Sequence, residues 1–211
     1  MTVSLLAVNF VNAQEETKSD DFKRWQVRFR GVGVVPNESA TIGVIGGDVA
    51  ISNALIPELD FTYFFTKNIA AELILGTAKH DVQDIETAAG TIDLGSVWLL
   101  PPTLTVQYHF LGNKETTFKP YVGAGVNYTL FYNAKSGIVK DVKYDNALGY
   151  AAQLGFDLML NDTFFINADV KHIFLFTDVA VDASNLAPGL NVPGKVDIIP
   201  WLIRLGFGMK F

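Results

Sequence analysis

Apolar and polar residues alternate with a period of two in eight separate segments of this chain, the last of which ends at Phe211. Successive side chains of a β-strand point to opposite faces, so a period of two indicates a strand. Each segment therefore predicts a strand with one apolar face and one face that carries polar or charged residues. The segments are 25–29, 55–65, 69–75, 100–110, 122–130, 148–158, 164–170 and 199–211.

The connections between these segments alternate strictly between short and long. The short ones are 66–68, 111–118 and 161–162, and the long ones are 36–53, 79–96, 132–146 and 175–197. If the strands follow one another in chain order around a barrel, this alternation collects the short turns at one end and the long loops at the other, as in outer-membrane barrels. A β-sandwich has no reason to alternate in this way.

Three features favour a barrel whose apolar face points outward into lipid. Many segments approach the ~10 residues that a tilted membrane strand needs. Large apolar residues occupy nearly every apolar face, and an eight-stranded barrel has no interior volume for them. Aromatic residues such as Trp25, Trp98 and Phe164 gather near segment ends, as in interfacial girdles. We therefore predict an all-β protein, an eight-stranded antiparallel up-and-down transmembrane β-barrel with four long extracellular loops and short periplasmic turns.

Composition narrows the classes of function. The net charge of −6 argues against nucleic acid as a partner, because such binding needs a basic surface. The absence of cysteine excludes thiol catalysis, a zinc–thiolate site and disulfide bonds. No apolar run approaches the ~18 residues of a membrane helix, so if the chain spans a membrane, it must do so with strands.

Residues 1–13 are expected to be the remnant of a secretory signal peptide, because residues 3–13 form an apolar core with a small-residue end at Ala13. The basic region that normally precedes such a core is missing, so a buried N-terminal strand or helix is the alternative. Residues 14–23 are expected to be a flexible lead-in. Residues 24–211 are then a single transmembrane β-barrel domain.

The inward-facing residues differ between the two ends of the predicted barrel. Near the long loops they are apolar, and we call this set the funnel: Val32, Val34, Ile56, Ile74, Pro101, Phe131, Ile173 and Leu202. Near the short turns they are polar or charged, and we call this set the plug: Arg28, Arg30, Glu58, Asp60, Glu72, His109, Asp157, Asp169 and Arg204. The carboxylates of the plug are expected to pair with its arginines and also with Lys171, and so to fill the barrel, because an unpaired buried charge is costly.

Several short motifs resemble those of the OmpW family of small outer-membrane proteins. They are YFFT at 63–66, LPPT at 100–103 with QYHF at 107–110, KPYVGAGVNYT at 119–129, and Pro200-Trp201 before a closing strand that ends in Phe. The resemblance covers about 25–211 and implies a barrel in the outer membrane of a Gram-negative bacterium with a narrow, largely hydrophobic channel. Members are thought to pass small apolar molecules, and the alkane-importing AlkL-type proteins belong to the same group.

The expected function is passive transport of small hydrophobic molecules. A solute would enter the funnel from the loop side and, instead of crossing the charged plug, leave sideways between strands into the membrane. Four prolines lack the N–H that a strand ladder needs and could weaken pairing at such a gap, although the simpler account of each is that it begins a strand or marks a bulge. They are Pro57, Pro101, Pro102 and Pro200.

Two other classes of function stay open. A structural or adhesive barrel would use its loops as a receptor for host surfaces, phage or bacteriocins, and would have no use for the funnel. An enzyme would need a nucleophile beside a base, and no Ser/His pair is evident in the sequence. His109 is expected to be a hydrogen-bonded filler of the lumen. We therefore expect no catalytic residue, no cofactor and no metal site.

The expected partners follow from the location of such a barrel. They are the lipid bilayer, lipopolysaccharide and small hydrophobic solutes. Leu205, Phe207 and Met209 form a lipid-facing stripe with Phe211 on the closing strand. A terminal aromatic residue on such a stripe resembles the signal that the outer-membrane assembly machinery reads, so that machinery is expected to recognise Phe211.

Overall fold

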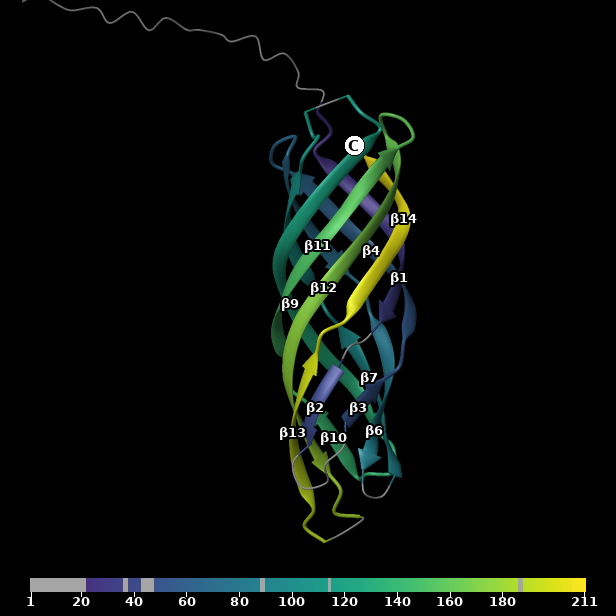
Figure 1. The fold of residues 1–211 in the computed structure, drawn as a ribbon, viewed down its shortest axis with the longest axis vertical. Helices are drawn as coiled ribbons and strands as arrows, with labels where there is room; N and C mark the ends of the chain where they lie inside the picture. Colours follow the sequence, from purple (N-terminus) through teal and green to yellow (C-terminus); the bar gives the residue numbers. More distant parts are fainter. Residues whose placement is uncertain (1–21, 36–37, 43–47, 88–89, 114, 186–187) are drawn as a thin grey trace, which may run out of the picture.

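The structure, a computed structural model, describes residues 22–35, 38–42, 48–87, 90–113, 115–185 and 188–211. All the regular secondary structure in the described residues is β-strand, and the strands together form one tall barrel (Figure 1). The expected signal remnant at 1–13 lies outside the described residues, and so does the lead-in up to residue 21. Within the described ranges, no helix is long and apolar enough to cross a membrane.

Eight strands pair in antiparallel order into a closed ring. They are β1 (Trp25–Val35), β4 (Ala54–Phe64), β5 (Ile69–Leu75), β8 (Thr103–His109), β9 (Phe118–Ser136), β11 (Ala147–Met159), β12 (Phe164–Asp182) and β14 (Trp201–Lys210). Each pairs with the next one in this series, and β14 returns to β1. Trp25 and Phe211 extend this seam with two backbone hydrogen bonds of 3.0 and 2.9 Å. Each ring strand contains or overlaps one alternating segment, which confirms the predicted up-and-down barrel.

Six further strands extend the wall of the barrel at the end opposite to the C-terminus (Figure 1). They are β2 (Glu38–Ile42), β3 (Asp48–Ile51), β6 (Ala78–Thr87), β7 (Gly90–Leu100), β10 (Asp141–Tyr144) and β13 (Asn191–Ile198). The outer halves of β9 and β12 join these extensions, because β9 pairs with β7, and β12 pairs with both β10 and β13. The connections expected as long loops therefore hold a good deal of β-structure.

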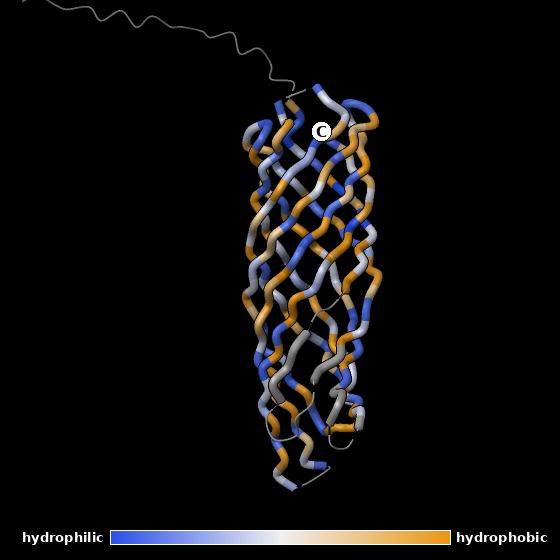
Figure 2. Tube along the Cα trace, viewed as in Figure 1, coloured by the Kyte–Doolittle hydropathy of each residue, from blue (hydrophilic) through white to orange (hydrophobic). Residues whose placement is uncertain are grey.

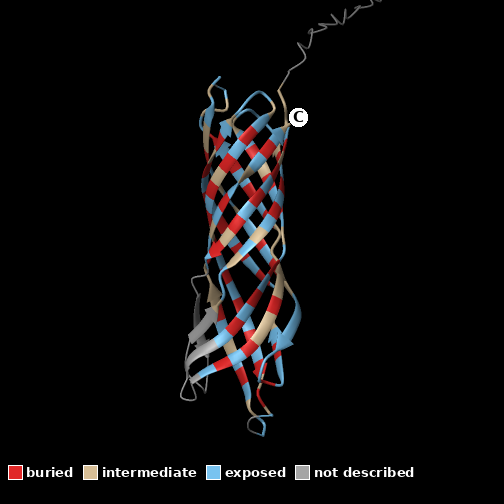
Figure 3. Cartoon of the chain, turned by 90° about the vertical axis from the view of Figure 1, so that its right-hand side faces the viewer, coloured by how far each residue is buried: buried red, intermediate tan, exposed pale blue. Residues whose placement is uncertain are grey.

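Buried and exposed residues alternate along the ring strands and form bands across the barrel (Figure 3). On the side of the short turns the inside of the ring is polar, and its outside is apolar. Arg28 and Glu72 have no exposed surface, whereas Phe29 is 64% exposed and Leu205 is 63% exposed. Hydrophobic residues accordingly recur along the whole wall (Figure 2). Water would penalise such a surface by about 25 cal/mol per Å², whereas a lipid bilayer favours it.

Aromatic side chains gather at two levels of the outer wall. Near the short turns, the ring centroids of Trp25 and Tyr63 lie 4.9 Å apart. Where the ring passes into the strand extensions, the centroids of Trp98 and Tyr132 lie 6.2 Å apart, and Trp201 is exposed on β14. Aromatic belts of this kind sit at the two membrane interfaces, so the strand extensions lie beyond the bilayer on the loop side.

Candidate functional site

A cavity of about 140 Å³ occupies the barrel where the ring passes into the strand extensions. Most of its lining is apolar. All eight funnel residues border it: Val32, Val34, Ile56, Ile74, Pro101, Phe131, Ile173 and Leu202. They belong to β1, β4, β5, β9, β12, β14 and the link between β7 and β8, so they surround the cavity from most of the ring. Their part in solute passage stays a prediction.

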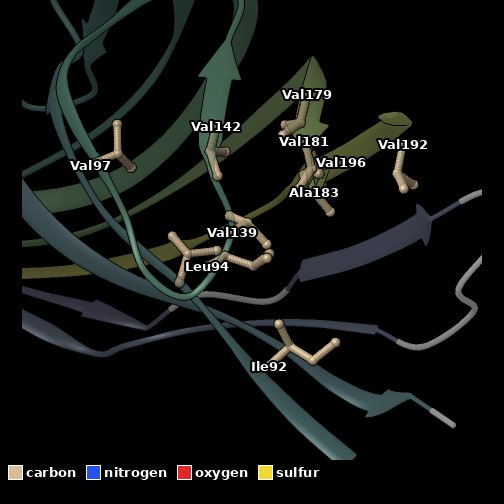
Figure 4. Packing of buried hydrophobic residues seen from close by; sticks show 11 residues of the cluster. Ile92, Leu94, Val97, Val139, Val142, Val179, Val181, Ala183, Val192 and Val196 are labelled. Carbon is tan, nitrogen blue, oxygen red and sulfur yellow. The ribbon is translucent and has the colours of Figure 1, made fainter. Parts of the chain in front are cut away.

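The strand extensions build the outer half of the cavity, which the alternating segments do not reveal. Val97 of β7, Val179 and Val181 of β12, and Val192 and Val196 of β13 line it and pack in one buried cluster. Figure 4 shows these valines on neighbouring strands around a common interior. A signal was present in the sequence, because Val179 and Val181 stand an even number of residues after the inward-facing Asp169, so a strand that continues beyond residue 170 turns them inward. It is weak because charged residues flank them.

Two aromatic rings lie between β9 and β10, two neighbouring strands that are not joined by a backbone ladder among the described residues. Phe131 of β9 and Tyr144 of β10 stack with their centroids 5.5 Å apart and an interplanar angle of 18°. Among the described residues β10 pairs with β12 alone, and the N–H of Phe131 donates to Asn146 Oδ1 at 3.0 Å. Burial raises the pKa of Tyr144 to about 12. Its hydroxyl therefore stays uncharged at neutral pH, and this part of the lining remains neutral.

On the turn side of the cavity, the plug residues form a buried ionic network. Arg28 Nε donates to Asp60 Oδ1 at 2.7 Å, and its Nη2 donates to Glu72 Oε2 at 2.9 Å. Arg30 lies between Glu58 and Asp60, with its Nη2 at 2.8 Å from one oxygen of each carboxylate. All five side chains are buried, so each charge depends on its partners instead of water.

Glu72 lies at the centre of this network. Lys171 Nζ donates to Glu72 Oε1 at 3.2 Å, and Arg204 Nη1 lies 3.5 Å from the same oxygen. Arg204 Nη1 also donates to Glu58 Oε1 at 3.2 Å, while its Nε and Nη2 bind the two oxygens of Asp169. These contacts cross the lumen and tie β4, β5, β12 and β14 together.

The last two predicted plug residues lie toward the short turns. Asp157 Oδ1 accepts a hydrogen bond from Asn167 Nδ2 at 2.8 Å. His109 Nε2 lies 3.1 Å from Gln107 Oε1, and the imidazole stacks on Tyr121 with centroids 4.9 Å apart. Within the described part of the chain, the hydrogen-bond partner of this imidazole is an amide and not a hydroxyl nucleophile.

Tyr121 extends the plug beyond the predicted set, and Lys171 joins it as a partner of the carboxylates, as expected from the sequence. The hydroxyl of Tyr121 donates to Asp169 Oδ2 at 2.9 Å and accepts from Asn167 Nδ2 at 3.0 Å. Lys171 Nζ donates to Thr105 Oγ1 at 3.1 Å as well as to Glu72. The period of two places both residues on the inner face of their strands. This alternation was the signal from which Tyr121 could have been predicted as a plug residue.

Known proteins with similar sequences are outer-membrane proteins. The model of the OmpW family matches residues 24–211. An uncharacterized outer-membrane protein of Sinorhizobium fredii, y4mB, is 49% identical over 190 residues, which are 89% of this chain and 80% of the relative. Outer membrane protein W of Vibrio cholerae is 35% identical over 194 residues, which are 88% of this chain and 87% of the relative.

A solved structure agrees with these sequence relatives. The crystal structure of the outer membrane protein OprG from Pseudomonas aeruginosa superimposes with a TM-score of 0.83 at 28% identity, and covers 90% of this chain and 96% of that one. The protein is thus located in the outer membrane of a Gram-negative bacterium, like the proteins it matches. From the family match over its whole barrel and the shared fold, the chain belongs to the OmpW family of outer-membrane β-barrel proteins.

Proposed function

We propose that this protein is a passive channel through which small hydrophobic molecules enter the outer membrane. The observation that carries the proposal is the cavity bordered by the funnel residues. A buried site of about 150 Å³ lined by aliphatic side chains is large enough to hold benzene, and the cavity is of similar size. Its apolar lining offers water and ions few hydrogen-bond partners, so it favours apolar solutes.

The plug acts in this proposal as the floor of the channel. A solute that crossed it would have to separate contacts such as Arg204–Asp169 and Arg28–Asp60, whose side chains are fully buried or nearly so. Losing a partner from a buried ion pair costs about 3–5 kcal/mol. Several such pairs lie in series, so we propose that solutes leave the cavity sideways instead.

The exit that we propose is a strip between β4 and β6. The ladder between β4 and β5 ends at the pair Leu59–Leu75, and residues 54–58 of β4 have no ladder partner on that side among the described residues. Ile56 and Gly76 border the cavity on the two sides of this strip. Pro57, which has no N–H to donate, lies within it.

The other prolines are weaker candidates for an exit. Pro102 O accepts a hydrogen bond from Tyr128 N at 3.0 Å, and Pro200 O accepts one from Ile173 N at 3.2 Å. Backbone hydrogen bonds therefore bridge the wall at Pro102 and at Pro200. At Pro101 a side chain bridges the wall, because Asn127 Nδ2 donates to Pro101 O at 3.3 Å. Among the described residues no ladder pair joins β4 to β6 at Pro57, and this favours the strip there.

Uptake of naphthalene into liposomes that carry the purified protein tests the proposed function. The wild type should take up naphthalene faster than empty liposomes. Exchanging Val34 and Leu202 for Asp should abolish the difference, because a solute would then have to pass buried charges. The matched control pair Val34→Leu and Leu202→Met keeps the lining apolar and should keep uptake. The proposal fails if the wild type is no faster than empty liposomes, or if uptake survives both Asp exchanges.

We also propose two contacts at the ends of the barrel. The assembly machinery of the outer membrane recognises Phe211, whose ring is exposed beside the lipid-facing Met209 of the closing strand. Lipopolysaccharide contacts the strand extensions, where Lys79, Lys135 and Lys143 are exposed and can meet its phosphate groups.

A further inference from the structure

Glu58 presents a free hydrogen-bond acceptor to the floor of the cavity. It borders the cavity from β4, and only 5% of the residue is exposed. Its Oε1 accepts from Arg30 Nε at 3.0 Å and from Arg204 Nη1 at 3.2 Å. Its Oε2 accepts no hydrogen bond within the described chain, and it is not among the fully enclosed atoms that lack a partner. This oxygen therefore meets the open space of the cavity.

Three other donor groups of the cavity lining already serve acceptors within the protein. Lys171 Nζ donates two of its three N–H groups, to Glu72 and Thr105, and has no exposed surface. Thr103 Oγ1 donates to Pro101 O at 3.0 Å, and Thr129 Oγ1 donates to Asn127 Oδ1 at 2.8 Å. Glu58 thus offers a bound molecule a free acceptor, while each of these three donor groups already serves an acceptor of the protein.

Among the plug carboxylates, Glu58 alone borders the cavity. Lys171 is the base of the lining that lies on the plug side, and its Nζ is 3.2 Å from Glu72 Oε1, so its charge is already paired. His80 also lines the cavity, and its Nδ1 lies 2.9 Å from Ser52 O.

We propose that the preferred solute is an apolar molecule with one hydrogen-bond donor, such as a hydroxyl group on an aromatic ring, held by the carboxylate of Glu58, and that carboxylate solutes are excluded. This proposal rests on the proposed channel function and names its substrate class. The hydroxyl would donate to Oε2 and form a charge-assisted hydrogen bond in a site poor in water. A solute carboxylate would instead place a second negative charge beside Glu58 and leave both without compensation.

Three probes with one ring system test this proposal: naphthalene, 2-naphthol and 2-naphthoate. Their binding to the full-length protein in lipid nanodiscs is measured by their own fluorescence, with empty nanodiscs subtracted. 2-Naphthol should bind about tenfold more tightly than naphthalene, as expected for one hydrogen bond to a charged group. 2-Naphthoate should bind most weakly. Equal affinity for naphthalene and 2-naphthol, or preference for the carboxylate, overturns the proposal.

Glu58→Gln and Asp157→Asn form a matched pair of variants. Both remove one negative charge from the plug, but Asp157 does not border the cavity. Glu58→Gln should reduce the preference for 2-naphthol and relax the exclusion of 2-naphthoate, whereas Asp157→Asn should leave both unchanged. If both variants change the selectivity alike, Glu58 is not the acceptor. If neither variant folds, the wild-type series alone decides.

Failure of this proposal is distinguishable from failure of the channel function. Liposomes that take up naphthalene and 2-naphthol equally fast, and both faster than empty liposomes, keep the channel and discard the role of Glu58. Liposomes that take up none of the three probes faster than empty ones discard both.

Discussion

Gly206 and Gly208 of β14 face the lumen where large side chains need space. A Cβ atom at Gly206 would overlap the carbonyl oxygen of Phe29 and the side chain of Arg30, and one at Gly208 would overlap Phe165. Forcing extra volume into a packed interior costs about 1–3 kcal/mol. The glycines of the closing strand therefore leave the space in the lumen that the arginines of β1 occupy.

We expect Gly206→Ala to lower the free energy of unfolding by about 1–3 kcal/mol. Gly31→Ala is the control, because its Cβ would lie 3.9 Å from Leu205 O and point outward, an ordinary contact. Urea titrations in lipid vesicles, followed by tryptophan fluorescence, give both values. Equal stability of the two variants would show that space at Gly206 does not limit the packing.

The ionic plug makes a second prediction for single residues. Arg204→Met leaves Asp169 buried with fewer partners, so it should lower the free energy of unfolding by about 3–5 kcal/mol. Lys79→Met removes an exposed pair with Asp81, of 3.3 Å, and should cost no more than about 1 kcal/mol. The same titration compares them. A loss that is similar in both variants would contradict a network that depends on burial.

Among the strands, the strip between β4 and β6 is where the proposed exit can be tested. A Cβ atom added at Gly76 would lie 3.9 Å from Pro57 O and from Glu58 Cγ, which are ordinary contacts, so a side chain there would begin to occupy this space. Gly76→Val should slow naphthalene uptake into liposomes several-fold, while the affinity for naphthalene in nanodiscs stays within about twofold, since cavity affinity follows the buried area.

The outward-facing Gly31→Val is the control for the strip, and it should leave uptake unchanged. Two results would count against the exit at Gly76. One is uptake at the wild-type rate in Gly76→Val. The other is a loss of affinity as large as the loss of uptake, which would mean that the new side chain fills the cavity itself.

The strands of the ring could be predicted from the sequence, whereas most of the extensions could not. A ring strand such as β11 keeps strict alternation over 13 residues. β10 has only four residues, DVKY, too few to establish a period. The ladder of β7 with β9 shifts register between Ser96 and Trp98, and Asn133 opposite has a φ of +49°. A bulge of this kind changes the parity of the faces, so alternation cannot be followed across it.

For the molecule as a whole, two features of the sequence were enough to predict which residues line the funnel. One is the face of its strand on which each residue lies, and the other is its distance from the long loops. Which carboxylate each arginine contacts could not be predicted. Glu72 of β5 binds Lys171, 99 residues away on β12, because the strands tilt and their side chains meet across the lumen. The free Oε2 of Glu58 was equally beyond prediction, since it depends on which oxygen the two arginines occupy.

Insertion into the membrane is tested at the C-terminus. Phe211→Ala keeps the backbone hydrogen bonds with Trp25 and removes only the ring. We expect the variant to refold into liposomes like the wild type but to accumulate several-fold less in the outer membrane of cells, since hairpin and seam formation do not need this ring. The band shift of unheated samples on gels measures both. Equal loss in liposomes and in cells would assign Phe211 to barrel stability instead.

The contacts of the plug cross the seam between β1 and β14 in both directions. Arg30 of β1 reaches Asp169 of β12, and Arg204 of β14 reaches Glu58 of β4. A chain with only some of its strands assembled would hold these charges in hydrocarbon without their counterparts, at a cost that few remaining contacts offset. The charges thus stabilise only the closed ring, in which every one of them has its partners. Folding should then be all-or-none, with the strands entering the membrane together and no half-built barrel accumulating on the way.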